Sequence, residues 1–158
     1  MPAEGPIAVD AMGGDGAPQT IVRGALEAVT ESGIPVRLVG PQKSLRRELG
    51  RFRFLPSGLE LVDAPEVVGM NDPAISVLRG KKRSSLNVCA ELVRDGKARA
   101  MVTAGNTGAA WVAAKSSLGM IDGVDRPALA AVLPKKQGHT LILTSLPMAP
   151  VSLEQVRS

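Results

Sequence analysis

Short runs of apolar residues alternate with longer segments of mixed polarity along most of the chain. Short runs rich in β-branched and aliphatic residues are typical of buried strands. The longer segments repeat apolar residues at three- and four-residue spacing, which is typical of helices that pack one face on a sheet. The pattern predicts strands at 7–9, 36–39, 59–62, 100–102, 129–133 and 140–143, and helices at 19–31, 44–49, 73–79, 85–94 and 109–118.

Capping residues mark several of these boundaries. Gly33 follows the first helix in the position of a C-cap. Asp72 is expected to cap a helix that starts at Pro73, which is a favoured first helical residue. Ser84 or Ser85 is expected to cap the helix that continues to residue 94.

The alternation of strands and helices indicates an α/β domain with a mostly parallel sheet covered on both faces. In such sheets, ligands bind outside the carboxyl ends of the strands. Two glycine-rich turns follow predicted strands, at residues 10–15 and 104–109, so both are expected at that edge.

The turn at 104–109 is the most informative segment, because two glycines bracket an amide and a hydroxyl just before a helix. Its backbone N–H groups and side chains can contact phosphoryl or acyl oxygens, although an ordinary strand-to-helix connection is the alternative. The turn at 10–15 can cradle an anion, hold a metal or cofactor head, or simply be a tight turn whose second carboxylate caps the next helix. The candidate residues in the two turns are Asp10, Gly13, Gly14, Asp15, Gly105, Asn106, Thr107 and Gly108.

Cationic residues provide a second group of candidates. Lys81 and Lys82 stand just before Ser84 and Ser85 at a predicted helix start, where a phosphate would meet both the cations and the helix dipole. A solvated helix cap is the competing interpretation. Arg126 can bind a phosphate or carboxylate through two N–H groups, or can pair with a neighbouring aspartate.

The composition narrows the functional classes to which the protein can belong. The net charge is +4 with basic clusters at 46–53 and 79–83, which indicates a solvated basic face or attraction to an acidic partner or a phosphate-bearing substrate. Aromatic residues make up 2% and no DNA-binding motif accompanies the charge, so nucleic acid is not expected as a partner.

The single cysteine, Cys89, fits a reducing cytoplasm and is expected to be a packed thiol, while the single histidine, His139, is expected at the surface. The sequence shows neither a signal peptide nor a membrane span.

Taken in order, several segments resemble the bacterial phosphate acyltransferase family of phospholipid synthesis. They are the opening IAVDAMGGDGAP motif, the basic segment at 79–85 with its two serines, the AGNTGA turn, and IDGVDRPALA at 121–130. The resemblance covers residues 6–143. It implies a three-layer α/β/α fold like that of isocitrate and isopropylmalate dehydrogenases.

The resemblance also implies a reaction, in which inorganic phosphate attacks the thioester of a long-chain acyl-acyl carrier protein to form acyl-phosphate. It implies a homodimer in the cytoplasm with peripheral membrane association, and no metal or cofactor is expected. From the chemistry of this reaction, Asn106, Thr107 and Lys82 are expected to act on phosphate or the acyl carbonyl. Lys81 and Arg126 would add positive charge, and Asp10 and Asp15 would order the neighbouring turn.

The chain departs from the family after residue 143, where residues 144–158 form a tail unlike the family's second half. We therefore expect only part of the family's fold, through a shifted reading frame or a deliberate truncation, and an inactive chain. Two alternative functions remain open: a phosphate acetyl- or butyryltransferase-like enzyme that uses acyl-CoA, and a non-catalytic fragment that binds phosphate or carrier protein.

Overall fold

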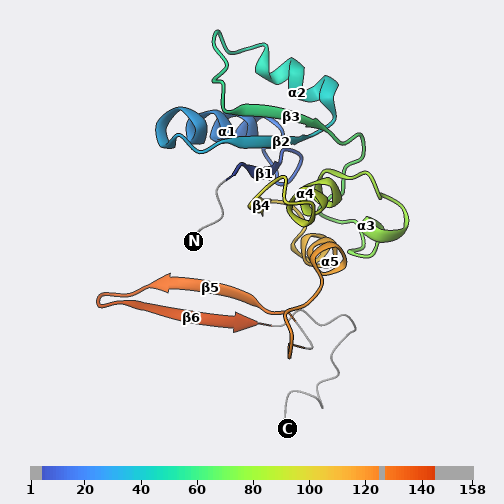
Figure 1. The fold of residues 1–158 in the computed structure, drawn as a ribbon, viewed down its shortest axis with the longest axis vertical. Coiled ribbons are helices and arrows are strands. Elements are labelled where there is room, and N and C mark those ends of the chain that lie inside the picture. Colours follow the sequence, from blue (N-terminus) through green and yellow to red (C-terminus); the bar gives the residue numbers. More distant parts are fainter. Residues whose placement is uncertain (1–4, 125–126, 145–158) are drawn as a thin grey trace. The chain divides into compact units, whose positions relative to one another are not determined.

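The structure is a computed structural model that describes residues 5–124 and 127–144. The chain divides into two compact units after Gly119. The first unit alternates strands and helices as the apolar pattern predicts (Figure 1). Its elements are β1 (Ile7–Asp10), α1 (Gln19–Ser32), β2 (Val36–Gly40), α2 (Gln42–Leu49), β3 (Leu59–Asp63), α3 (Ser76–Arg79), α4 (Ser85–Arg94), β4 (Ala100–Val102) and α5 (Thr107–Leu118).

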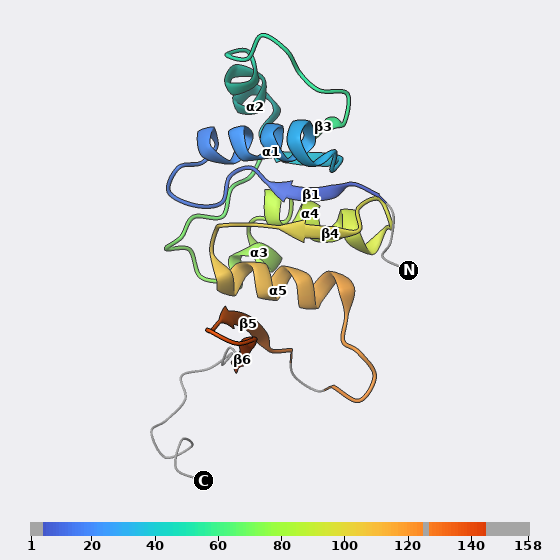
Figure 2. The same ribbon diagram turned by 90° about the vertical axis from the view of Figure 1, so that its left-hand side faces the viewer.

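The four strands of the first unit form one parallel sheet in the order β3-β2-β1-β4. Side chains alternate between its faces, so that Val9 of β1 packs toward α1 whereas Ala8 packs toward α4. Figure 2 shows α1 and α2 on one side of the sheet and α3, α4 and α5 on the other. The expected three-layer α/β/α arrangement with a parallel sheet is therefore confirmed for this unit.

Helix α1 covers one face because its apolar residues recur at helical spacing. Val22, Leu26 and Val29 are buried against residues of β2 and α2. Gly33 ends the helix with φ of 63° and donates its N–H to the carbonyl of Ala28, as the sequence predicts.

Helix α4 covers the other face. Ser84 is its N-cap and accepts the N–H of Asn87, which confirms the predicted cap. The thiol of Cys89 is fully buried, and burial followed by the negative charge of Asp10 raises its pKa well above the ordinary value. The prediction of a packed rather than reactive cysteine is confirmed.

Three helix starts differ from the sequence-based predictions. Helix α2 begins at Gln42, and α5 begins at Thr107 because Asn106 caps it. The predicted helix at 73–79 is shortened to Ser76–Arg79, and Asp72 does not cap it. The carboxylate of Asp72 is instead bound by the Gly69 N–H and the Lys81 ammonium group, which leaves it unavailable as a cap.

The second unit contains β5 (Leu129–Pro134) and β6 (His139–Thr144), which pair antiparallel. The two predicted strands are confirmed, but they form a hairpin of their own rather than joining the parallel sheet. The turn between them, which includes Gly138 with φ of 78°, is too short for a parallel crossover. His139 is exposed, as expected.

Within the described ranges, the longest helix covers 14 residues and no helix has the length and apolar content that a bilayer crossing requires.

Two glycines of the first unit should respond oppositely to substitution. A Cβ on Gly24 in α1 would meet no atom within 4 Å, so Gly24→Ala should raise the free energy of unfolding by roughly 0.5–1 kcal/mol. A Cβ on Gly13 would lie 2.6 Å from the Gly105 nitrogen, so Gly13→Ala should lower that free energy. Urea unfolding of both variants tests the contrast, and equal effects would contradict it.

Candidate functional site

The two glycine-rich turns lie side by side at the carboxyl edge of the sheet. Strands β1 and β4 are parallel neighbours, with Val9 opposite Val102, so the turns that follow them meet. A Cβ on Gly105 would lie 3.0 Å from the Gly13 Cα, which shows how closely the two backbones approach. Gly14 has φ of 94°, a conformation that favours glycine. This pair of turns is the candidate site.

A buried carboxylate joins the two turns. Asp10 is 2% exposed, and its Oδ1 accepts the Met12 N–H at 3.0 Å. Its Oδ2 accepts the Thr103 hydroxyl at 2.7 Å, and the Thr103 Oγ1 accepts the Gly105 N–H at 3.0 Å. These bonds compensate the carboxylate for the water it loses on burial. Asp10 thus orders its own turn and, through Thr103, the turn at 104–109.

Thr103 is a site residue that sequence reasoning missed. It lies directly between β4 and the glycine-rich turn, and this position was the only signal in the sequence that could have identified it. Its partner, Asp10, is 93 positions away along the chain.

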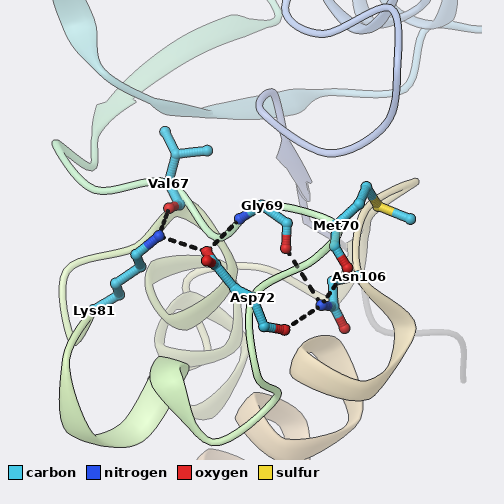
Figure 3. A network of polar contacts seen from close by, with 6 residues as sticks. All are labelled: Val67, Gly69, Met70, Asp72, Lys81 and Asn106. Carbon is cyan, nitrogen blue, oxygen red and sulfur yellow. Dashed lines mark hydrogen bonds and ion pairs between the residues drawn. The ribbon is translucent and has the colours of Figure 1, made fainter.

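Asn106 ties a third segment to the site (Figure 3). Its Oδ1 accepts the Ala109 N–H at 3.0 Å and so caps α5. Its Nδ2 lies 3.3, 3.1 and 3.0 Å from the carbonyl oxygens of Gly69, Met70 and Asp72. The sequence suggests that the Asn106 amide contacts a substrate oxygen. In this structure, the amide holds the loop at residues 69–72.

The same loop is held from its other side by an ion pair. The Asp72 Oδ2 lies 2.5 Å from the Lys81 Nζ and accepts the Gly69 N–H at 2.7 Å. The Lys81 Nζ also donates to the Val67 carbonyl at 2.7 Å. The bond from Lys81, followed by that from Gly69, lowers the pKa of Asp72 below its ordinary value. The charge of Lys81 is therefore balanced by a carboxylate within the protein.

The remaining candidate residues from the sequence differ in exposure and surroundings. Lys82, Asp15 and Thr107 are exposed. Ser84 and Ser85 are 0% and 1% exposed, so their side chains belong to the packed start of α4. Gly108 lies close to Ala74, since a Cβ on Gly108 would be 3.2 Å from the Ala74 Cβ. Arg126 lies outside the described residues.

The site offers backbone donors to an anion. No acceptor among the described residues takes the N–H groups of Gly13, Gly14, Thr107 or Gly108. The last two open helix α5, where the helix dipole is positive. Residues 5–124 and 127–144 bring together no group of three or more Asp, Glu, His or Cys residues that could hold a metal ion. Unbonded backbone N–H groups at the positive end of a helix favour an oxyanion as the ligand.

Comparison with known proteins identifies a family for the chain. Residues 6–147 match the family model described as "Fatty acid synthesis protein". The chain belongs to the fatty acid synthesis protein family. It is 52% identical over 139 residues to a protein of Pelotomaculum thermopropionicum and 50% identical over 137 residues to one of Pelobacter propionicus, both named phosphate acyltransferase.

Each match covers 87% of this chain but 40% of the relative. A Geobacter sulfurreducens protein, also named phosphate acyltransferase, is 46% identical over a match that again covers 87% of this chain and 40% of the relative. The chain thus spans about two fifths of the length of the curated relatives it matches.

For this member of the fatty acid synthesis family, we expect Thr103→Val to lower the free energy of unfolding by about 1–3 kcal/mol. Valine leaves a buried Asp10 oxygen and the Gly105 N–H without their shared partner. Thr103→Ser keeps the hydroxyl and should retain most of the stability. Urea unfolding compares the three proteins, and equal losses in both variants would assign the effect to packing instead.

The Asp72 bonds should also depend on pH. The folded pKa of Asp72 lies below its unfolded value, so these bonds stabilise the loop fully above the unfolded pKa of about 3.9. The stabilisation should be lost as the pH falls through the lowered folded pKa. The NMR shift of the Gly69 N–H, followed from pH 7 downward, should stay constant until that point.

Lys81→Met provides the control for this titration. It removes the largest cause of the lowered pKa, so the midpoint should move to higher pH. An unchanged midpoint in Lys81→Met would contradict the assignment of the ion pair.

Proposed function

We propose that this chain supplies the phosphate-binding part of an acyltransferase that forms acyl-phosphate from a long-chain acyl-acyl carrier protein and inorganic phosphate. The observation that carries the proposal is the meeting of the two glycine-rich turns with unbonded N–H groups at one edge of the sheet. The relatives' name, phosphate acyltransferase, supports the class of reaction.

Phosphate would lie between the turns. The N–H groups of Gly13, Gly14 and Gly108 and the exposed Thr107 side chain can donate to its oxygens. Lys82 is exposed just before α4 and would add a cation to this edge. Arg126 stays a candidate from the sequence alone, because it lies outside the described residues.

The reaction needs no group on the protein to form a covalent bond. A phosphate oxygen attacks the thioester carbonyl carbon, a C–O bond forms, and the C–S bond breaks. The carrier's sulfur leaves with the electron pair and takes up a proton, which gives acyl-phosphate and a free thiol. The protein orients the two reactants and stabilises the oxyanion that forms at the carbonyl.

The state of the cysteine agrees with direct attack by phosphate. Cys89 is buried, and its raised pKa keeps the thiol protonated, so it is a poor nucleophile.

Several residues act through the backbone rather than on the substrate. Asp10 and Thr103 set the spacing of the two turns, and Asn106 joins the start of α5 to the loop at 69–72. We therefore assign Asn106 a positioning role beside its predicted contact with substrate. Ser84 caps α4, and Ser85 is buried at the start of that helix.

The proposed substrate carrier is acyl carrier protein, and a homodimer is proposed for the complete enzyme. Because the chain spans 40% of its relatives, we expect turnover to require the remaining length. In isolation, the chain would bind phosphate without turnover.

A chimera tests the proposal. Residues 1–143 of this chain are continued with the remaining length of the Pelotomaculum relative, and acyl-phosphate formation from palmitoyl-acyl carrier protein is measured. We expect turnover by the chimera and none by the 158-residue chain. Turnover with palmitoyl-CoA but not with the carrier protein would favour the acetyl- or butyryltransferase-like alternative. Phosphate binding without turnover by the chimera would favour the non-catalytic alternative.

Within the chimera, Lys82→Met should lower kcat/KM for phosphate about tenfold or more, because it removes a cation from the proposed phosphate site. Lys43→Met is the matched control, since Lys43 is also exposed but lies on α2. Equal losses in both variants would remove Lys82 from the site.

A further inference from the structure

Helix α1 leaves part of one sheet face uncovered. Within the described residues, α1 packs mainly on β2 and β3, while α4 lies against the opposite face of β1 and β4. Ile7 and Val9 of β1 are therefore only half-buried, and Val102 of β4 is 52% exposed. Parallel strands are ordinarily covered on both faces, so this apolar strip requires a partner.

A groove of about 280 Å³ lies between α1 and the uncovered strip. Residues of α1 between positions 20 and 28 form its wall, and residues of β1, β2 and β4 form its floor. Thr20 supplies the one polar side chain of the lining, which is otherwise aliphatic or glycine. The volume is close to the lower end of the range for ligand pockets, roughly 300–1,000 Å³, and the lining suits a hydrocarbon.

Gly24 keeps this groove open. It lies in the middle of the α1 wall, and a Cβ there would meet no atom within 4 Å. Its backbone is ordinary helix, so no turn geometry requires a glycine. Glycine inside a helix costs roughly 0.5–1 kcal/mol relative to alanine. The missing side chain therefore serves the space of the groove rather than the helix.

The groove adjoins the candidate site. Val9 and Val102 in its floor directly precede Asp10 and Thr103, the two residues that hold the glycine-rich turns together. Thr20 lies in its wall and donates its N–H to the carbonyl of residue 16, just after the turn at 10–15. A ligand bound at the turns can therefore extend directly into the groove.

The length of the groove suits an extended acyl chain. Helix α1 begins at the carboxyl edge of the sheet and returns the chain to the amino end of β2, so Thr20 marks the end near the site and Ala28 lies toward the other end. The eight residues between them rise about 12 Å. This length holds about nine or ten methylenes, since C–C bonds of about 1.5 Å advance an extended chain by roughly 1.3 Å each.

We propose that this groove binds the acyl chain of the substrate and that Gly24 sets how much of the chain it admits. The chain would enter at the carboxyl edge, where Thr20 and Val102 line the groove, with its carbonyl at the glycine-rich turns and its methylenes along α1. The identity of the ligand as a substrate rests on the proposed function. Its chemical class, a hydrocarbon chain, rests on the groove.

Fatty-acid binding to the 158-residue chain tests the groove without turnover. Saturated fatty acids of graded length displace the fluorescent cis-parinaric acid, and the Kd of each is measured below its micelle concentration. Binding should tighten about three- to fourfold per methylene up to about ten carbons and little beyond, because the groove is then filled. An absence of binding, or affinity that does not depend on chain length, would overturn the proposal.

Variants locate the bound chain. Gly24→Leu fills the groove and should weaken decanoate binding about tenfold or more, while Val102→Gln makes the floor polar and should weaken it about threefold or more. Thr30→Leu is the matched control, because Thr30 is exposed on α1 outside the groove, and its affinity should be unchanged. Urea unfolding confirms that each variant folds. Unchanged affinity in folded Gly24→Leu and Val102→Gln, or an equal loss in Thr30→Leu, would overturn the proposal.

The chimera with the Pelotomaculum relative separates this inference from the proposed function. Gly24→Leu in the chimera should lower the ratio of kcat/KM for palmitoyl- over hexanoyl-acyl carrier protein about tenfold and leave the KM for phosphate unchanged. Turnover with an unchanged ratio would overturn the groove and leave the proposed function intact. A chimera without turnover would count against the proposed function, and the fatty-acid titration would still decide the groove. Loss of fatty-acid binding in the chimera would show that the remaining length covers the groove, which would overturn the proposal.

Discussion

The hydrogen bond between Asp10 and Thr103 is the constraint on which the candidate site depends. It joins the ends of two adjacent parallel strands and keeps a buried carboxylate satisfied. Because the Thr103 Oγ1 also accepts the Gly105 N–H, one carboxylate fixes both glycine-rich turns. The close approach of Gly13 to Gly105 then leaves no space for a side chain between them. Glycine is required there by the spacing of the strands as well as by local turn geometry.

A second layer of bonds surrounds this centre. Asn106 holds the loop at 69–72 against the start of α5, and Lys81 holds the same loop through Asp72. Cations near a phosphate site are readily interpreted as ligands, but Lys81 is already paired in this structure. Lys82, one residue further, is exposed and remains the better candidate for a substrate contact. The two neighbouring lysines thus differ in their surroundings, since among the described residues a carboxylate pairs with Lys81 and none pairs with Lys82.

Much of the first unit could be predicted from local sequence, since strand ends and helix faces follow from apolar spacing. The meeting of the two turns was also predictable, because carboxyl ends of parallel strands share an edge. The hydrogen bonds from Thr103 to Asp10 and from Asn106 to the loop could not be predicted, because the partners lie 93 and 34–37 positions away. Asp72 misled the prediction of a helix start because Lys81, nine positions further on, and the Gly69 N–H bind its carboxylate. The apolar pattern at 129–144 predicts both strands correctly. The turn between them is short, so the two strands pair antiparallel.

The sheet order also bears on how the protein folds. Strands β1, β2 and β3 pair with neighbours in sequence, whereas β4 must pair with β1, with Ile7 opposite Ala100. Contacts between such distant segments close a long loop and generally slow folding. The site is built on this most distant pairing, so it cannot form before β4 has paired with β1. An anion that binds the two turns would therefore select chains in which β4 has paired with β1, and would stabilise them by mass action.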